Sequence, residues 1–207
     1  IGEIINSYKE GWSIFVSSLA VNLYTATNVV VLGMLTNNVI VGYYSAADKL
    51  ITCVRRGIYA VSDAIYPFIS KMMKDDISKG LQFIKKQIFL YLVVGLIGCT
   101  SLFFFSDTIV KLLFGADYNL TVDVLRILSF VPLAVAISTV FGEETMLPLN
   151  MNSAYSRTLV LAAFFSLLSI FPLCYLWGAK GVAMTMLLTE FLIMIIMGGL
   201  LRKQLFQ

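Results

Sequence analysis

The chain has 207 residues, of which 59% are hydrophobic and 13% are charged, and its mean hydropathy is +0.88. Because about a quarter of the residues in a soluble domain are charged, these values exclude an ordinary soluble domain, a disordered chain, a collagen and a coiled coil. The net charge of +3 is too small to indicate a nucleic-acid partner. The composition indicates an all-α integral membrane protein.

Six apolar segments follow one another along the chain, each long enough for the roughly 20 residues that a spanning helix needs. Residues 1–10 mix charged and apolar side chains and lack the pattern of a signal peptide. We interpret them as a cytoplasmic lead-in, in a chain that begins inside a longer protein. The predicted six-helix transmembrane bundle covers residues 11–207, with spans at residues 11–35, 41–72, 87–106, 120–141, 157–177 and 181–201.

Polar segments separate these predicted spans. Residues 71–86 are rich in lysine and predict a link. Residues 107–118 are too short and too charged to cross a membrane, and they predict an interfacial helical turn that ends at Gly115. A further link contains Glu143, Glu144 and Pro148.

Lysine and arginine indicate the orientation of such a bundle, because cytoplasmic segments carry an excess of them. With a cytoplasmic N-terminus, nine of the fifteen basic residues fall in inside segments and two fall in outside links. The inside residues are Lys9, Lys71, Lys74, Lys79, Lys85, Lys86, Arg157, Arg202 and Lys203, and the outside residues are Lys111 and Lys180. We therefore predict that both termini are cytoplasmic.

The second span is unusual because it contains five charged residues, namely Asp48, Lys49, Arg55, Arg56 and Asp63. Each would cost about 2.5–3.5 kcal/mol at the centre of the bilayer if it faced lipid. Lys49, Arg56 and Asp63 recur every seven residues, close to two helical turns, and Asp48 and Arg55 form a parallel row beside them. The pattern predicts one polar face that forms the wall of a water-filled cavity.

The charges of this face indicate an anionic, phosphorylated substrate. Lys49, Arg55 and Arg56 are the candidate binding residues, because guanidinium groups hold phosphate through paired hydrogen bonds. We expect Asp48 and Asp63 to pair with Arg55 or Arg56 and to tune or gate them, which leaves one spare positive charge. The alternative is a set of buried ion pairs that only hold helices together.

Glu190 is a second candidate, because it lies near the middle of the sixth span within a long uncharged run. A carboxyl group at that depth suits proton coupling, cation binding or pairing with a cation of the second span. A protonated, hydrogen-bonded carboxyl group in a helix contact is the structural alternative. The sequence leaves these possibilities open.

Catalytic and metal chemistry find no support in the sequence. It contains no histidine, which removes the commonest metal ligand and imidazole catalysis. Its three cysteines lack metal-ligand or redox spacing, and no phosphate-binding loop or nucleophile motif occurs. We predict no catalytic residue, no metal and no cofactor.

Four short motifs carry a resemblance to a known family. They are Glu10-Gly11-Trp12, Val41-Gly42-Tyr43-Tyr44-Ser45-Ala46-Ala47, Leu113-Phe114-Gly115-Ala116-Asp117-Tyr118 and Gly178-Ala179-Lys180-Gly181-Val182-Ala183. Their order and spacing resemble the second half of O-antigen flippases, in the polysaccharide-exporter branch of the multidrug/oligosaccharidyl-lipid/polysaccharide superfamily. The resemblance covers almost the whole chain.

The resemblance implies the C-terminal six-helix bundle of a MATE-like transporter of about twelve helices, without its N-terminal helical bundle. Such proteins are not enzymes; they flip undecaprenyl-diphosphate-linked oligosaccharide units across the bacterial inner membrane by alternating access, driven by an ion gradient. The implied partners are this lipid-linked oligosaccharide, the lipid bilayer, the missing bundle and the O-antigen polymerase machinery, with no nucleic acid. Lys49, Arg55 and Arg56 would hold the pyrophosphate, and Glu190 would couple the cycle to protons.

Three other functions remain as alternatives. An ion-coupled drug or metabolite antiporter of the same superfamily would favour acidic and aromatic cavity residues over arginines. A membrane glycan polymerase or ligase would need a large outer loop, which no predicted outside link provides. A purely structural membrane subunit would not need the costly charges of the second span.

Overall fold

The computed structural model describes the backbone of residues 2–115 and 117–206, and the side chains of these residues except 2–10, 13, 14 and 206. The side chain of Lys9 and the side chains of the predicted cytoplasmic lead-in, residues 1–10, therefore lie outside the described residues. The described elements are α1 (Gly2–Leu35), α2 (Asn38–Asp75), α3 (Ile77–Phe114), α4 (Asn119–Leu128), α5 (Val131–Phe141), the π-helix η1 (Gly142–Met146), α6 (Asn152–Trp177) and α7 (Ala179–Phe206). The predicted all-α fold class is confirmed.

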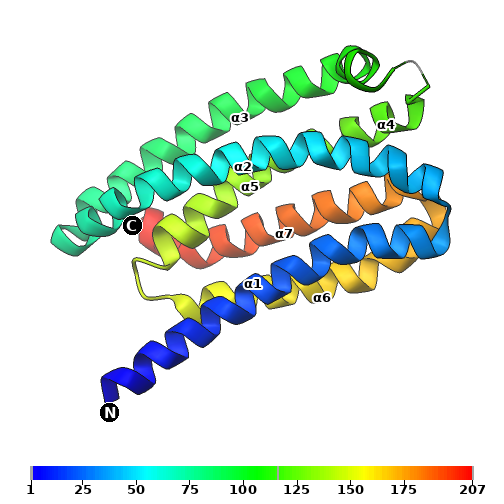
Figure 1. Ribbon diagram of the computed structural model, residues 1–207. Helices are drawn as coiled ribbons and strands as arrows, with labels where there is room; N and C mark the ends of the chain where they lie inside the picture. Colours follow the sequence, from blue (N-terminus) through cyan, green and yellow to red (C-terminus); the bar gives the residue numbers. More distant parts are fainter. Residues whose placement is uncertain (1, 116, 207) are drawn as a thin grey trace.

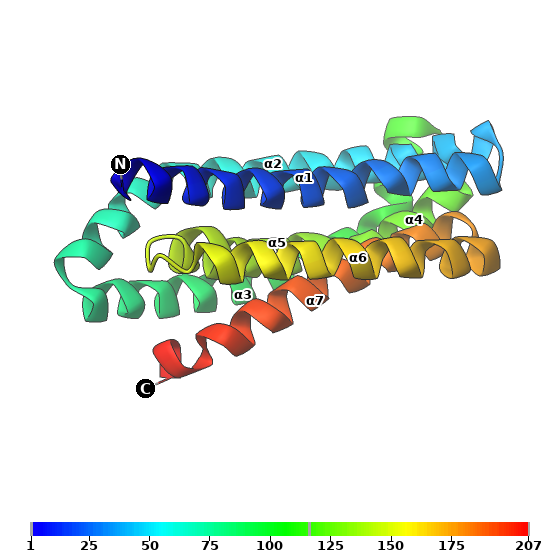
Figure 2. The ribbon, with the colours of Figure 1, turned by 90° about the horizontal axis from the view of Figure 1, so that it is seen from below.

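The long helices form an elongated bundle in which most run along a common direction (Figures 1 and 2). The α1–α2, α3–α4 and α6–α7 turns lie at one end of this bundle. The two ends of the chain, the α2–α3 turn and the link from η1 to α6 lie at the other. The chain therefore passes along the bundle an even number of times.

Within the described ranges, five helical segments are long and apolar enough to cross a membrane. They are Phe15–Leu35, Ile77–Phe114, Asn119–Met146, Asn152–Trp177 and Ala179–Leu205. The remaining long helix, α2, has 38 residues but carries the charged residues of the second predicted span. Because hydropathy does not mark α2 as a span, the sixth crossing stays a prediction.

The lysine-rich segment at residues 71–86 is helical almost throughout, although it was expected to be a link. Only Asp76 separates α2 from α3, and its Oδ1 accepts hydrogen bonds from the backbone amides of Ser78 and Lys79 at 2.9 and 3.2 Å. A carboxylate in this position caps the orphan amides at a helix start. Lysine is a good helix former, so the polarity of this segment does not mark the end of a helix.

The other end of α3 lies where the sequence predicted it. The helix continues through Asp107 to Phe114, and Gly115 ends it with φ of 99°. That left-handed backbone conformation favours glycine, because a Cβ atom would be strained there. The predicted interfacial turn is therefore the last part of α3 rather than a separate helix.

The fourth predicted span, residues 120–141, is divided into α4 and α5, and η1 follows it directly. Pro132 lies in the first turn of α5, where its missing N–H group costs no helical hydrogen bond. In η1 the backbone follows a wider π-helical turn, in which the amide of Leu147 donates to the carbonyl of Gly142 at 3.1 Å. Glu143 and Glu144, expected in a link, therefore belong to a helical turn of the bundle.

Apolar side chains pack into two main clusters, one toward each end of the bundle. The first joins the end of α1, the start of α2, α4 and the α6–α7 turn, and includes Leu32, Ile51, Leu125 and Val182. The second joins the other ends of α1, α2 and α7 with the starts of α3 and α6, and includes Ile69, Ile84, Leu159 and Leu201. Arg55 on α2 and Glu190 on α7 lie between these clusters along their helices.

Candidate functional site

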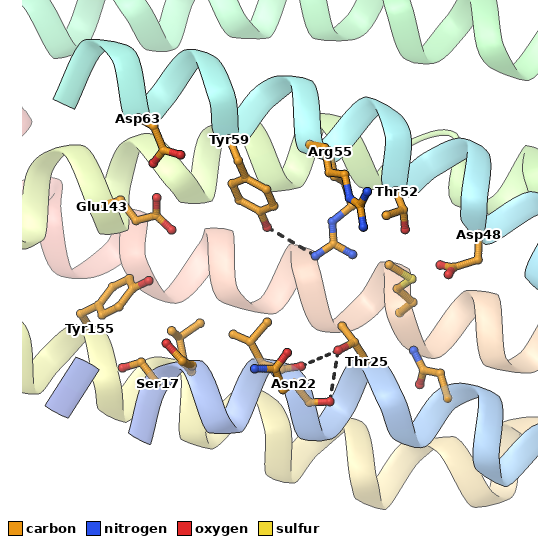
Figure 3. A pocket seen from close by; sticks show the side chains of 16 residues that line it. Ser17, Asn22, Thr25, Asp48, Thr52, Arg55, Tyr59, Asp63, Glu143 and Tyr155 are labelled. Atoms are coloured by element: carbon orange, nitrogen blue, oxygen red, sulfur yellow. Dashed lines mark hydrogen bonds between the residues drawn. The ribbon is translucent and has the colours of Figure 1, made fainter. Parts of the chain in front are cut away.

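A polar cavity of about 740 Å³ opens between α1 and α2, and residues of η1, α6 and α7 complete its lining. Figure 3 shows that side chains of α2 face those of α1 across it, with Glu143 and Tyr155 at one side. The lining residues are Ser17, Ser18, Val21, Asn22, Thr25 and Asn28 of α1, Asp48, Thr52, Arg55, Arg56, Tyr59 and Asp63 of α2, and Glu143, Tyr155, Leu159 and Met186. Most carry a hydroxyl, amide, carboxylate or guanidinium group, which is costly inside a membrane unless the space is hydrated or occupied by a polar ligand.

The polar face of α2 lines this cavity through residues spaced three or four apart, from Asp48 to Asp63. Such spacing places side chains on one side of a helix. Lys49 is not among the lining residues, and its side chain is exposed outside the cavity. The side chain of Lys49 therefore does not contribute to the cavity, although its heptad spacing places it close to Arg56 around the helix.

A buried ion pair links α2 to α7 beside the cavity. The Nη2 atom of Arg55 lies 3.3 Å from Oε1 of Glu190, and the two residues are 8% and 3% exposed. The Tyr24 hydroxyl of α1 donates to the same oxygen at 3.2 Å, and Arg55 donates to the Tyr59 hydroxyl at 3.4 Å. Of the possibilities left open for Glu190, the structure shows pairing with a cation of the predicted second span.

The other charged residues of the cavity have a different arrangement from the one expected. Neither Asp48 nor Asp63 forms an ion pair with Arg55 or Arg56 within the described residues. Arg55 is engaged by Glu190 instead. Among the described lining residues, Arg56 is thus the cation without a counterion in contact.

Sequence reasoning missed the contribution of α1 and of η1 to this cavity. Ser17, Ser18, Asn22, Thr25 and Asn28 recur at helical spacing in an uncharged span, a weak polar stripe that predicts a buried polar face. Glu143 follows a long uncharged run, and only the π-helical turn brings it to the cavity. The spacing of the polar residues in α1 could have predicted their place in the cavity, whereas no sequence pattern predicts the π-helical turn.

Comparison with known proteins finds similarity to one protein family and to three individual proteins. A family described as "Polysaccharide biosynthesis protein" matches residues 1–73. Two relatives named "Putative O-antigen transporter" are 33% identical over 187 residues, in Escherichia coli (strain K12), and 30% identical over 194 residues, in Shigella dysenteriae. These alignments cover 90% and 94% of this chain but 45% and 48% of the relatives.

A third relative is more distant. The capsular polysaccharide biosynthesis protein CapF of Staphylococcus aureus is 27% identical over 184 residues, which cover 86% of this chain and 45% of that protein. The chain thus spans about half the length of the curated relatives it matches. No solved structure matches the chain.

The helical fold, the five apolar segments and the polar cavity define a multi-pass membrane protein. The first third of the chain matches the family described as "Polysaccharide biosynthesis protein", and most of the chain is similar to one half of two proteins named for O-antigen transport. These matches bear out the resemblance to O-antigen flippases seen in its motifs.

Proposed function

We propose that this chain forms one half of a transporter that moves a lipid-linked polysaccharide unit across the bacterial inner membrane. The observation that carries the proposal is the polar cavity of about 740 Å³ inside a bundle of apolar helices. A glycan has many hydroxyl groups and needs such a polar path, whereas its lipid anchor does not. The names of the two O-antigen relatives support transport rather than catalysis.

The cavity offers separate groups for the two polar parts of such a substrate. Arg56 has no ion-pair partner in the described chain, and its guanidinium group suits paired hydrogen bonds to a diphosphate. Arg55 can also bind the diphosphate, but its guanidinium group then contacts both Glu190 and the ligand. Hydroxyl and amide groups of α1, such as Asn22 and Thr25, and the carboxylates Asp48 and Asp63 of α2 suit the sugar hydroxyls.

The proposed cycle is alternating access, in which a second helical bundle covers the open side of the cavity. The relatives are about twice as long as the aligned region, which supports such a second half. The two bundles would rock against each other and open the cavity first to the cytoplasm, where both termini lie, and then to the outside. An undecaprenyl chain would stay in the lipid while the diphosphate and sugars pass through the cavity.

The test is replacement of both cavity arginines in cells that depend on this protein for O-antigen display. Arg55→Ala/Arg56→Ala should lower display at least about tenfold, since hydrogen bonds to charged groups contribute about 1.5–3 kcal/mol each. Lys85→Ala/Lys86→Ala is the matched control, because it removes two adjacent, exposed cations outside the cavity. Undiminished display by the arginine variant, at equal amounts in the membrane, would contradict the proposal.

A second candidate function is an ion-coupled antiporter of cationic compounds. It is favoured by the three carboxylates and two tyrosines that also line the cavity, namely Asp48, Asp63, Glu143, Tyr59 and Tyr155, because such groups bind organic cations. Asp63→Asn/Glu143→Gln would then abolish efflux of a fluorescent cationic dye and leave glycan display intact. This candidate would be excluded if the wild-type protein exported no dye and the double variant lost glycan display.

A further inference from the structure

Glu144 is a buried carboxyl group that the proposed cavity does not use. It is fully buried, is not among the residues that line the cavity, and lies in the π-helix η1. The Ser62 hydroxyl of α2 lies 2.6 Å from Oε1, and Nε2 of Gln87 on α3 lies 2.6 Å from Oε2. The carboxyl group therefore joins three elements at one point.

No positive charge compensates Glu144. In the part of the chain that the structure describes, it forms no ion pair, and its two hydrogen-bond partners, Ser62 and Gln87, are neutral. The titratable groups that face it are Tyr91 of α3 and the neighbouring Glu143. Glu143 itself faces Asp63 of α2 and Tyr155 of α6.

Such surroundings disfavour a carboxylate. Burial of an unpaired charge costs several kcal/mol, whereas a neutral carboxylic acid with hydrogen bonds costs far less. The observed contacts suit the neutral acid, which has one O–H donor and one carbonyl acceptor. The Gln87 amide donates to one oxygen, and the other can share a proton with Ser62, because a hydroxyl group acts as donor or acceptor.

We propose that Glu144 is a proton-binding site, held in the neutral acid form by its contacts with Ser62 and Gln87 and distinct from the Arg55–Glu190 pair. The two buried glutamates then have different states. Glu190 is kept ionised by a guanidinium group at 3.3 Å, whereas Glu144 has only neutral donors.

The surroundings of Glu144 also indicate how the proton leaves. Oε1 of Gln87 and the hydroxyl of Tyr91 are buried without a hydrogen-bond partner among the described residues, so the polar network around Glu144 is incomplete in this conformation. A shift of α2 or α3 against η1 would break the Ser62 or Gln87 contact and bring in the Tyr91 hydroxyl as a donor to a carboxylate. π-Helical turns inside α-helical segments are frequent at functional sites, and η1 is the segment that such a shift would rearrange.

Infrared spectroscopy of the protein in lipid nanodiscs at neutral pH tests the proposal directly. Comparison of wild type with Glu144→Gln should show loss of one carbonyl stretch of a protonated carboxylic acid, with the shift in heavy water that an exchangeable proton produces. Comparison with Glu190→Gln should show loss of carboxylate bands instead. Loss of carboxylate bands alone on removal of Glu144 would overturn the proposal.

A second measurement needs no variant and decides the question if Glu144→Gln does not fold. Apolar carbodiimides in the membrane add the O–H group of a protonated carboxylic acid across one N=C bond, and the adduct rearranges to a stable N-acylurea. Mass spectrometry of the wild-type protein should find Glu144 modified at least about tenfold more than Glu190, because only the protonated form reacts. Modification of Glu190 in preference to Glu144 would refute the assignment.

The proton site rests on burial and hydrogen bonding, so it stands independently of the proposed function, but its use in transport rests on that function. Glu144→Gln imitates the permanently protonated state and should lower O-antigen display at least about tenfold if release of the proton is part of the cycle. Normal display together with the infrared loss would exclude the coupling role while leaving the proton site in place. A chain that does not transport glycans would leave both spectroscopic results unchanged.

Discussion

The two side chains of the Arg55–Glu190 ion pair differ in whether they can become neutral. Arginine stays charged in proteins, whereas a carboxyl group can take up a proton and become neutral. Loss of Glu190 therefore leaves a charge that nothing else in the contact compensates, while loss of Arg55 leaves a group that neutralises itself. The contact fixes the positions of α1, α2 and α7 relative to one another, but it contributes little to the net free energy of folding.

We expect the two single substitutions to be unequal for this reason. Glu190→Gln should destabilise the protein by about 3 kcal/mol, the usual cost of leaving one member of a buried pair alone, and Arg55→Met should cost clearly less. Arg55→Met/Glu190→Met should recover most of the loss. Thermal unfolding in detergent measures the three variants, and equal losses for both single variants would contradict this account.

At the residue scale, the sequence predicted the polar face of α2, but it left pairing with Glu190 as one possibility among several and wrongly paired Asp48 and Asp63 with the arginines. Helical spacing alone brings Asp48, Arg55 and Asp63 to one side of a helix. The pairing of Arg55 with Glu190 joins residues that are 135 positions apart, and nothing local in the sequence specifies it. Lys49 was assigned to the same face on its heptad spacing, but its side chain does not line the cavity.

Close packing sets the geometry of the α6–α7 pair among the elements. Gly178 ends α6 with φ of 55°, a conformation that favours glycine. A Cβ atom at Gly181 would collide with the backbone carbonyl of Leu173 on α6. Since backbone atoms on both sides cannot move aside as a flexible side chain can, α7 passes α6 at a distance that only glycine permits.

Alanine at Gly181 should therefore destabilise the protein by about 1–3 kcal/mol, the range for overpacking. The control is Gly199→Ala in the same helix, where a Cβ atom would meet nothing within 4 Å. Alanine there should be neutral or stabilising, by up to about 1 kcal/mol, because it is the better helix former. Unfolding temperatures of the two variants provide the test, and a drop at Gly199 equal to that at Gly181 would contradict the packing argument.

The cap of α3 predicts a pH dependence outside the membrane-spanning segments. The pKa of Asp76 lies below its usual value, mainly because the backbone amide of Lys79 donates a hydrogen bond to its carboxylate. The side chain of Lys79 lowers the pKa of Asp76 further. Because the folded pKa is the lower one, the cap stabilises the protein at neutral pH, and this contribution disappears as pH falls through the acidic range.

Asp76→Ala should accordingly lower the unfolding temperature at neutral pH, and its difference from wild type should shrink on acidification. Asp76→Asn keeps a side-chain oxygen acceptor without a titrating proton, so the contribution of its cap should not vary with pH. The unfolding temperatures of the three proteins are compared over a pH series. No difference between Asp76→Ala and wild type at any pH would show that the cap is irrelevant to stability.

The order and type of the elements were largely predictable from sequence, whereas their ends were not. Apolar length marks the part of a helix that lies in lipid, and it gives no information on how far α2 and α3 continue beyond that part. The π-helical turn of Gly142–Met146 has no sequence signature that separates it from a link. Gly115 was a correct stop signal, because its left-handed conformation is a local property.

At the scale of the whole molecule, two apolar clusters hold the ends of the bundle together and leave a polar section between them. The cavity lies along this section, bounded by α1 and α2 (Figure 3). Because the chain spans about half the length of its relatives, we expect a second bundle to close the cavity in a complete transporter. The central claim is that glycans travel through this space.

The measurement that tests this claim most directly is photo-crosslinking with a lipid-linked glycan that carries a diazirine on its sugars. After illumination in membranes, mass spectrometry identifies the residues that are bonded to the sugar. We predict crosslinks to cavity residues such as Asn22 and Thr52, and none to the outward, exposed side of α3 near Leu96. Crosslinks confined to that outer side of α3, with Asn22 and Thr52 unmodified, would contradict the account.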